Sequence, residues 1–358
     1  MSGYLVKSKN MEETFKSGAV PDTRTEKERE GDYKFKEVVA SVAPVDWKEK
    51  PQTEWRKFPI FNQDGSGSCV AQTQAKELGI MRFLKDGVYV HFSASDIYQR
   101  RANKPGAGMG SADVRAVVKR GGATLEVLSP SQGMTDEQMD SVIVEDYKRK
   151  VGEVFKVPNY IELPSADIEA IASVIQTTKK GVMVWFYFKI DEWTEHPVIK
   201  YPGMGLYDDG VARHSITAVD YTLVNGKKCL IIEDSWGTAY GMAGQRVIDE
   251  DFFRARNFYA GYLVNFSFDV SPTEKPHHTF FTDMEFGQTS GEVKWLQDCL
   301  KYEGLFPANA SSTGYFGAIT RKSVRDFQDK HGVTTPSNPG YGKVGPLTRG
   351  FLNDIYGQ

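Results

Sequence analysis

One cysteine of this chain stands where its thiol could act as a nucleophile. Cys69 follows a run of small, flexible residues, FNQDGSGS, and directly precedes a helical pattern. A helix N-terminus lowers the pKa of a thiol, because its unpaired N–H groups and positive dipole favour the thiolate. Gly65 and Gly67 let the backbone approach a substrate closely, and the amide of Gln63 could donate to an oxyanion. The pattern therefore indicates covalent chemistry by a thiolate.

Such a nucleophile needs an imidazole to hold its proton and a third group to orient that imidazole. Among six histidines, His214 stands at the head of a strand-like run. Asp234 opens DSWG at the end of the next such run, and the pair Asn225-Gly226 between the runs is a strong hairpin signal. A hairpin would bring His214 and Asp234 side by side.

Each of these residues also has a purely structural interpretation. A single buried cysteine is more often an inert, small hydrophobic residue than a nucleophile, and a lone histidine at a strand start is similarly ambiguous. Cys229 fits a packed strand residue, and Cys299 lies on a short predicted helix, where we expect partial burial. The three cysteines lack CxxC spacing, so neither a disulfide framework nor a metal site is expected, and no cofactor is implied.

The elements that must position these residues change type along the chain. Helical patterns run from Cys69 to Gly87 and from Ser111 to Lys119, and two more begin at Met134 and Ser165. Runs rich in β-branched and aromatic residues follow at 181–190, 214–224 and 227–236, as is typical of buried strands. Helices first and an antiparallel sheet second predict an α+β domain in two halves.

The two ends of the chain differ from this central region. Residues 1–43 are polar and lack an apolar period, which predicts a disordered or extended arm, or a short pro-segment. Residues 271–284 contain two prolines and no periodic pattern, so we expect a linker there. Residues 285–358 predict a small all-α module of three helices, with Thr320 as the N-cap of the second helix.

Charge and hydropathy exclude some classes of partner. The net charge of −3, from 44 basic and 47 acidic side chains, argues against nucleic-acid binding driven by bulk charge. No apolar run approaches the roughly 20 residues that span a bilayer, so membrane insertion is not expected. The N-terminus lacks the apolar core of a secretory signal, which predicts synthesis in the cytoplasm.

Five motifs, in the same order along residues 44–270, resemble those of the papain-like cysteine peptidases. They are PVDWKEK from Pro44, NQDGSGSCVA around Cys69, GAGMGSAD from Gly106, RHSITAVDY around His214 and DSWGTAYGMAGQRVI from Asp234. The resemblance implies an α+β, papain-like two-lobed domain, with a helical lobe and an antiparallel β lobe.

The resemblance also implies a role for each matching residue. Cys69 would attack a peptide carbonyl as a thiolate paired with protonated His214, and Asp234 would orient that histidine. Gln63 and the backbone N–H of Cys69 would bind the oxyanion, and Trp236 would shield the bond between His214 and Asp234 from water. Met109 and Gly110 would contact the backbone of the substrate, and Gly67 would leave room for that backbone.

Some positions depart from the family pattern. Asp234 stands where the family usually has Asn, although a carboxylate still accepts from an imidazole N–H and favours the imidazolium further. Val70 replaces the aromatic residue that commonly follows the nucleophile, and Ser66 replaces a cysteine that usually forms a disulfide. Residues 1–43 are too short and too polar to resemble closely the long inhibitory pro-segment of many relatives.

The C-terminal module resembles the bacterial peptidoglycan-binding domain of three helices, over residues 291–353. The resemblance rests on GEVKWLQDCLKYEG, TGYFGAITRKSVRDFQDKHGV and GKVGPLT. It implies that residues 285–358 bind peptidoglycan, although such modules can also serve as spacers or protein docks. Tyr315, Asn309 and Arg321 are candidates for a groove that holds sugar or stem peptide.

Together, the two resemblances predict a cysteine endopeptidase that acts on a peptide or protein substrate and is held at the bacterial cell wall. A bacteriophage lytic enzyme, or one released without a signal, would reconcile wall binding with cytoplasmic synthesis. Two alternatives stay open. One is a catalytically silent wall-binding structural protein, and the other is a wall amidase or acyl-transfer enzyme that uses the same dyad.

Overall fold

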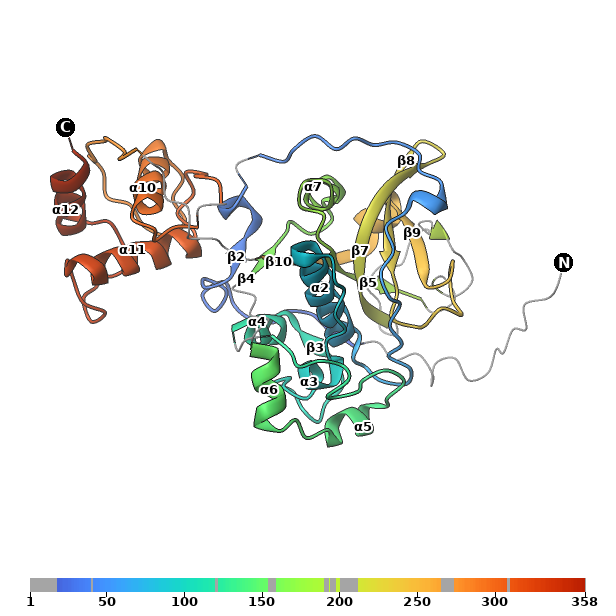
Figure 1. Cartoon of the computed structure of the whole chain (residues 1–358). Coiled ribbons are helices and arrows are strands. Elements are labelled where there is room, and N and C mark those ends of the chain that lie inside the picture. Colours follow the sequence, from blue (N-terminus) through green and yellow to red (C-terminus); the bar gives the residue numbers. More distant parts are fainter. Residues whose placement is uncertain are drawn as a thin grey trace. The chain divides into compact units, whose positions relative to one another are not determined.

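The computed structural model describes most of the chain and divides it into two compact units (Figure 1). The described residues are 18–39, 41–119, 122–153, 159–189, 193, 198–199, 212–264, 274–307 and 310–357. The larger unit comprises the described parts of Met1–Thr23 and Ala43–Leu263, and the smaller unit those of Arg24–Val42 and Val264–Gln358. In the described part of the chain, no helix combines the length and apolarity needed to cross a membrane.

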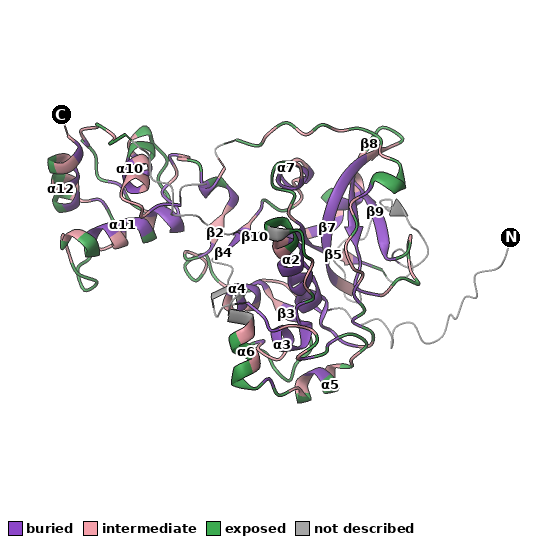
Figure 2. Cartoon of the chain, viewed as in Figure 1, coloured by how far each residue is buried: buried purple, intermediate pink, exposed green. Residues whose placement is uncertain are grey.

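Helix α2 (Cys69–Asp86) is the central element of the larger unit, and it ends at Gly87 in the left-handed conformation. Its residues from Cys69 to Ile80 are all buried (Figure 2), and the helix begins and ends where the sequence predicts. Helices α3 (Ala94–Tyr98) and α4 (Ser111–Lys119) pack against α2, and α5 (Asp136–Ser141) packs against α3. Helix α6 (Asp146–Glu153) follows α5 in the chain. The helical pattern from Met134 therefore forms two short helices, interrupted after Ser141, in place of one long helix.

The strands of the larger unit form a mixed, mostly antiparallel sheet. The strand order is β4-β10-β5-β7-β8-β9-β6. Helices α7 (Ile168–Thr178) and α9 (Glu250–Arg256) pack against this sheet. The strands are β4 (Asn159–Glu162), β5 (Val182–Phe188), β6 (Val198–Ile199), β7 (Ala212–Val224), β8 (Lys227–Glu233), β9 (Gln245–Asp249) and β10 (Asn257–Val264). The hairpin prediction is confirmed: β7 and β8 pair antiparallel, and Asn225 and Gly226 turn with φ of 51° and 78°.

Two kinds of contact fix α2 on this sheet. Val70 and Leu78 of the helix share a hydrophobic cluster with Met183 and Trp185 of β5, and each such buried side chain contributes about 1.5–3 kcal/mol. A buried ion pair of 2.9 Å joins Lys76 Nζ on the helix to the Glu233 carboxylate at the end of β8. The helix that begins with Cys69 is thereby tied to the strand that leads into Asp234.

The smaller unit contains α10 (Gly291–Tyr302), α11 (Ala318–His331) and α12 (Pro346–Tyr356), as expected of a three-helix module. The predicted N-cap was wrong: Gly317 caps α11, and Thr320 lies inside the first turn. Of the expected linker, residues 274–284 are described, and Phe280 and Met284 are buried. Met284 also forms a β-bridge with Val344, so this part of the linker packs as part of the unit.

The polar arm divides between the two units. Residues 1–17 lie outside the described residues. Strand β1 (Ala19–Val20) belongs to the larger unit, where it pairs in parallel with β3 (Met109–Gly110). The short strand β2 (Tyr33–Lys34) and the 3-10 turn η1 (Phe35–Glu37) belong to the smaller unit. The described part of the arm thus contains turns as well as two short strands, and its two ends belong to different units.

Candidate active site

Cys69 is the first residue of α2 and is fully buried. The first N–H groups of a helix lack partners within the helix, so they face a group placed at this end. The other two cysteines sit in different surroundings, where burial raises the pKa of Cys229 and of Cys299 to about 12. Cys299 is also completely buried, so the expectation of partial burial was wrong. Cys229 and Cys299 therefore remain thiols at neutral pH.

The hairpin brings His214 and Asp234 together, as the sequence indicates. His214 lies on β7 opposite Phe186 of β5, and Asp234 follows the last residue of β8. His214 Nε2 and Asp234 Oδ1 are 2.7 Å apart, and both side chains are fully buried. The carboxylate therefore holds the orientation of the ring through this nitrogen, and the other nitrogen, Nδ1, is left for a reacting group.

The charges of this pair reinforce each other. Burial alone would lower the pKa of His214, but attraction to Asp234, its hydrogen bond and the neighbouring Cys69 together raise that pKa to about 9. Among the described residues, Nδ1 makes no hydrogen bond. Burial likewise opposes ionisation of Asp234, yet the attraction of His214 and Arg246 holds its pKa well below the usual range. The imidazolium and the carboxylate thus stabilise each other across neutral pH.

Asp234 receives donors at both carboxylate oxygens. Besides His214, the backbone N–H of Ser235 donates to Oδ1 at 2.7 Å. Trp193 Nε1 donates to Oδ2 at 2.7 Å, and Arg246 Nε donates to the same oxygen at 3.1 Å. Arg246 is itself almost completely buried and also donates to the carbonyl of Trp193. Neither Trp193 nor Arg246 stood out in the sequence, since no local pattern connects them to Asp234.

Aromatic rings cover the histidine and its carboxylate. The ring of Trp236 is tilted over His214 at a centroid distance of 4.9 Å, and it is 4% exposed. The rings of Phe188 and Trp193 each lie 5.8 Å from that of His214. Since these rings exclude water, the interaction between His214 and Asp234 takes place in surroundings of low dielectric constant.

Gln63 lies in the loop that precedes Cys69, and hydrogen bonds hold both ends of its side-chain amide. Its Oε1 accepts from Ser235 Oγ at 2.6 Å, and its Nε2 donates to the Ser66 carbonyl at 2.8 Å. Its backbone N–H donates to the Ser235 carbonyl at 2.7 Å. Because the amide oxygen accepts from a hydroxyl donor and the amide nitrogen donates to a carbonyl, the orientation of the Gln63 amide is defined.

Replacing Gln63 by alanine is expected to lower kcat for peptide hydrolysis by about 10²-fold, the usual loss when one oxyanion donor is removed. KM should change little, because the donor acts on charge that develops in the transition state. Gln52→Ala, at an exposed position, is the control. Steady-state kinetics on a short peptide test this, and an unchanged kcat would remove Gln63 from the oxyanion site.

Gly67, Met109 and Gly110, the residues expected to face substrate, lie against the N-terminal arm. Ala19 and Val20 pair with Met109 and Gly110. The Gly18 carbonyl accepts from Met109 N–H at 2.7 Å, and the Gly18 N–H donates to the Arg213 carbonyl at 3.2 Å. A Cβ on Gly18 would lie 1.7 Å from the Gly67 carbonyl oxygen. The arm thus forms backbone hydrogen bonds with residues that the sequence predicts to contact substrate.

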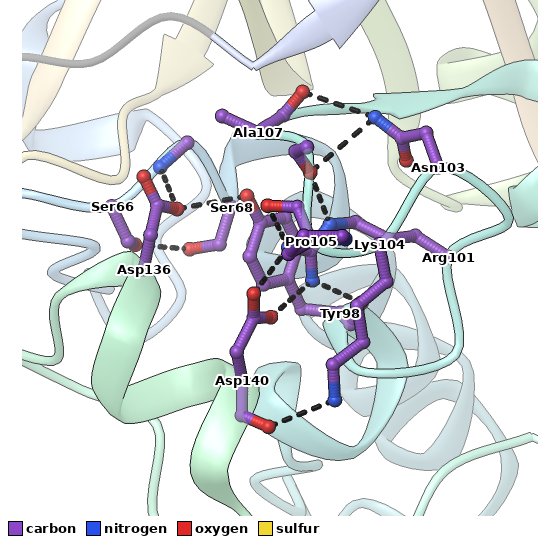
Figure 3. A network of polar contacts seen from close by, with 12 residues as sticks. Ser66, Ser68, Tyr98, Arg101, Asn103, Lys104, Pro105, Ala107, Asp136 and Asp140 are labelled. Atoms are coloured by element: carbon purple, nitrogen blue, oxygen red, sulfur yellow. Dashed lines mark hydrogen bonds and ion pairs between the residues drawn. The ribbon is translucent and has the colours of Figure 1, made fainter.

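A polar network behind the loops was not found from the sequence (Figure 3). Asp136 Oδ1 accepts from the Gly67 N–H and from Tyr98 Oη, both at 2.8 Å. Tyr98 Oη in turn accepts from the Gly108 N–H at 3.1 Å. These hydrogen bonds connect the loop before Cys69 to the segment that leads into β3, so they set the spacing between that loop and that segment.

Replacing Tyr98 by phenylalanine is therefore expected to raise KM for a peptide several-fold and to leave kcat nearly unchanged. The lost hydrogen bonds are worth roughly 1–2 kcal/mol, and they act on the position of the substrate-facing loops rather than on the reacting atoms. Tyr147→Phe, on an exposed tyrosine, is the matched control. A fall in kcat with constant KM would assign Tyr98 a different role.

Comparisons with known proteins agree with this geometry. Residues 42–252 match the model of the "Papain family cysteine protease", and residues 289–352 match that of a "Putative peptidoglycan binding domain". Mouse cathepsin S is 27% identical over 210 residues, covering 56% of this chain and 56% of its own. The senescence-specific cysteine protease SAG12 of Arabidopsis thaliana is 24% identical over 235 residues, covering 61% of this chain and 60% of its own.

The fold is similar to that of a solved bacterial structure, xylellain, a cysteine protease from Xylella fastidiosa. The TM-score is 0.54 at 17% identity, and the match covers 70% of this chain and 96% of xylellain. The prediction of a two-lobed α+β domain with a small all-α C-terminal domain is thereby confirmed. The chain spans little more than half the length of the curated relatives. Its papain-type region nevertheless accounts for more than half of its own residues, and the chain belongs to the papain family of cysteine proteases.

Proposed function

We propose that this protein is a cysteine endopeptidase that uses Cys69, His214 and Asp234. The observation that carries the proposal is the buried 2.7 Å contact between His214 Nε2 and Asp234, with Cys69 at the start of the buried helix beside them. An inert buried cysteine has no need of a charged histidine as its neighbour. The raised pKa of His214, to which Cys69 contributes, fits a thiolate–imidazolium pair.

The reaction follows from this arrangement. The Cys69 thiolate attacks the peptide carbonyl carbon, and the resulting oxyanion accepts from the Cys69 N–H and Gln63 Nε2. His214 Nδ1 gives its proton to the leaving amine as the C–N bond breaks, which leaves an acyl thioester on Cys69. Water then loses a proton to His214 and attacks the thioester, so that the thiolate and the imidazolium are restored.

Labelling with an epoxide that traps active thiols tests the assignment. We expect one adduct, at Cys69, located by mass spectrometry after digestion. Cys229 and Cys299 should stay unlabelled in the folded protein, because both are buried thiols with pKa values raised to about 12. Absence of an adduct at Cys69, together with no hydrolysis of casein or cell walls, would favour a catalytically silent protein.

The arm at Gly18 is expected to lower activity in the resting protein, because it and a substrate compete for the same edge. Gly18→Ala should raise the rate of hydrolysis of a short peptide about tenfold, since the new Cβ collides with a backbone carbonyl 1.7 Å away and expels β1. Gly31→Ala, where a Cβ meets nothing within 4 Å, is the control. Equal rates for wild type and Gly18→Ala would show that β1 does not obstruct the cleft.

The C-terminal domain is proposed to hold the enzyme at bacterial peptidoglycan, where the local concentration of substrate is raised. The match of residues 289–352 supports this placement. Digestion of purified cell walls followed by analysis of the products distinguishes the reactions. New peptide termini fit an endopeptidase, whereas stem peptides freed from sugar would indicate an amidase that uses the same dyad.

A further inference from the structure

The arm that pairs with β3 in the larger unit continues along the chain into a segment that belongs to the smaller unit. Ala19 and Val20 pair with Met109 and Gly110, and Ser111 Oγ donates to the Asp22 carboxylate at 3.0 Å. Residues 30–38 follow within the same stretch of backbone and contact the three-helix unit. Both contacts are therefore made by one covalently continuous segment, residues 18–38.

A buried carboxylate fixes this segment on the smaller unit. Glu37 Oε2 accepts from the Ile319 N–H at 2.9 Å, in the first turn of α11. A Cβ on Gly317 would lie 2.2 Å from the Glu37 carboxyl carbon, so the glycine N-cap leaves the space that Glu37 fills. Helix α11 has no side-chain cap of its own. A carboxylate from 282 residues away takes that place.

Two further charged residues of the same segment contact residues that the sequence predicts to bind peptidoglycan. Arg321 donates to both the carboxylate and the backbone carbonyl of Glu30, at 2.9 Å each. Lys36 Nζ stands 3.9 Å from the centre of the Tyr315 ring. Tyr315 and Arg321 are thus both occupied, and the third candidate, Asn309, lies outside the described residues.

Residues 30–38 present the same kinds of charged group as a wall peptide. Two carboxylates and an ammonium group lie against a helix N-terminus, a guanidinium and an aromatic ring. Stem peptides of peptidoglycan likewise carry carboxylates and often an amine. Burial raises the pKa of Glu37 to about 7 in spite of the N–H groups of Ile319 and Lys34. Burial therefore offsets part of the stabilisation that these N–H groups give to the charged form.

We propose that residues 30–38 cover the stem-peptide site of the C-terminal domain, so that a carboxylate-bearing wall peptide binds there by displacing them. Displacement also pulls on the linked strand β1, which frees the edge formed by Met109 and Gly110. Wall binding and substrate entry are then coupled through competition for one segment. This inference rests on the proposed function for its effect on hydrolysis, but not for the competition itself.

The test uses the full-length protein and soluble muropeptides released from purified sacculi by a muramidase. Muropeptides should raise hydrogen exchange across residues 18–38 and raise the rate of hydrolysis of a short peptide several-fold. Glu37→Ala should bind muropeptides about tenfold more tightly, because the competing segment is loosened. It should also show the raised exchange and the raised rate without any muropeptide.

Two further variants keep the result interpretable. Gly317→Ala keeps the Glu37 residue but puts a methyl group into the space that its carboxylate occupies. It should therefore raise the hydrogen exchange of residues 18–38 to a similar extent. Glu26→Ala, which removes an exposed carboxylate of the same arm, should behave like wild type. The proposal is overturned if muropeptides bind without changing that exchange, or if they bind Glu37→Ala no better than wild type or not at all. If no variant hydrolyses peptide, the proposed function fails, while binding and exchange still decide this inference.

Discussion

Cys69→Ala is expected to lower kcat/KM for peptide hydrolysis by about 10⁴- to 10⁶-fold, as happens when the nucleophile of a catalytic triad is removed. The thiolate is the group that forms the covalent intermediate, so its loss removes the entire route. Stability should change little: the thiol is small, and alanine keeps the helix start. Kinetics on a short peptide, with urea unfolding in parallel, separate the two effects.

Cys299, another buried thiol, provides a matched control. Cys299→Ala changes the same side chain in the smaller unit, so it should retain the full rate of hydrolysis. Residual activity above about 1% in the Cys69→Ala protein would contradict the mechanism, because it would require a second nucleophile. Loss of activity in Cys299→Ala with unchanged unfolding would equally contradict it.

Asp234→Asn is expected to destabilise the protein by about 3–5 kcal/mol, although it restores the residue usual in the family. A carboxylate can accept from all four donors around it, which come from His214, Ser235, Trp193 and Arg246. An amide has one oxygen, so its NH₂ group would face donors on the other side. The buried guanidinium of Arg246 would also lose its counter-charge. These contacts explain why this chain carries Asp at this position.

The same substitution should move the alkaline limb of the pH–rate profile to lower pH. Interaction with Asp234 raises the pKa of His214 to about 9, so the imidazolium persists to that pH. Without the carboxylate its pKa falls, and the thiolate–imidazolium pair is lost sooner as pH rises. The stabilisation given by the raised pKa of His214 is complete below about pH 6.5 and disappears towards pH 9. The stabilisation from the lowered pKa of Asp234 is present above about pH 4 and is lost in acid.

A double variant provides the decisive control. Asp234→Asn with Arg246→Met removes both charges, and it should recover most of the lost stability, because replacing a buried ion pair by neutral groups is often nearly neutral. The alkaline limb should stay shifted, since the carboxylate is still absent. Urea unfolding and pH–rate profiles measure both. A single variant as stable as wild type, or a double variant less stable than the single, would show that Arg246 does not depend on Asp234.

Local patterns were sufficient to predict much of the site. Small residues before a helical pattern placed Cys69 at a helix start, and Asn225-Gly226 predicted the hairpin that joins His214 to Asp234. Both depend on short-range backbone preferences, which act wherever those residues occur. The three helices of the C-terminal domain follow from the same kind of signal, although the cap of α11 does not, because a distant carboxylate supplies it.

The sequence by itself determined which cysteine, histidine and acid are the candidates for the site, and which elements bear them. Only the tertiary structure decided that Arg246 and Trp193 hold the acid, that Tyr98 and Asp136 connect the two loops, and that the polar arm pairs with Met109 and Gly110. These contacts join residues far apart in the chain. Their energy comes from geometry that exists only after folding, and no periodic pattern or turn signal records it.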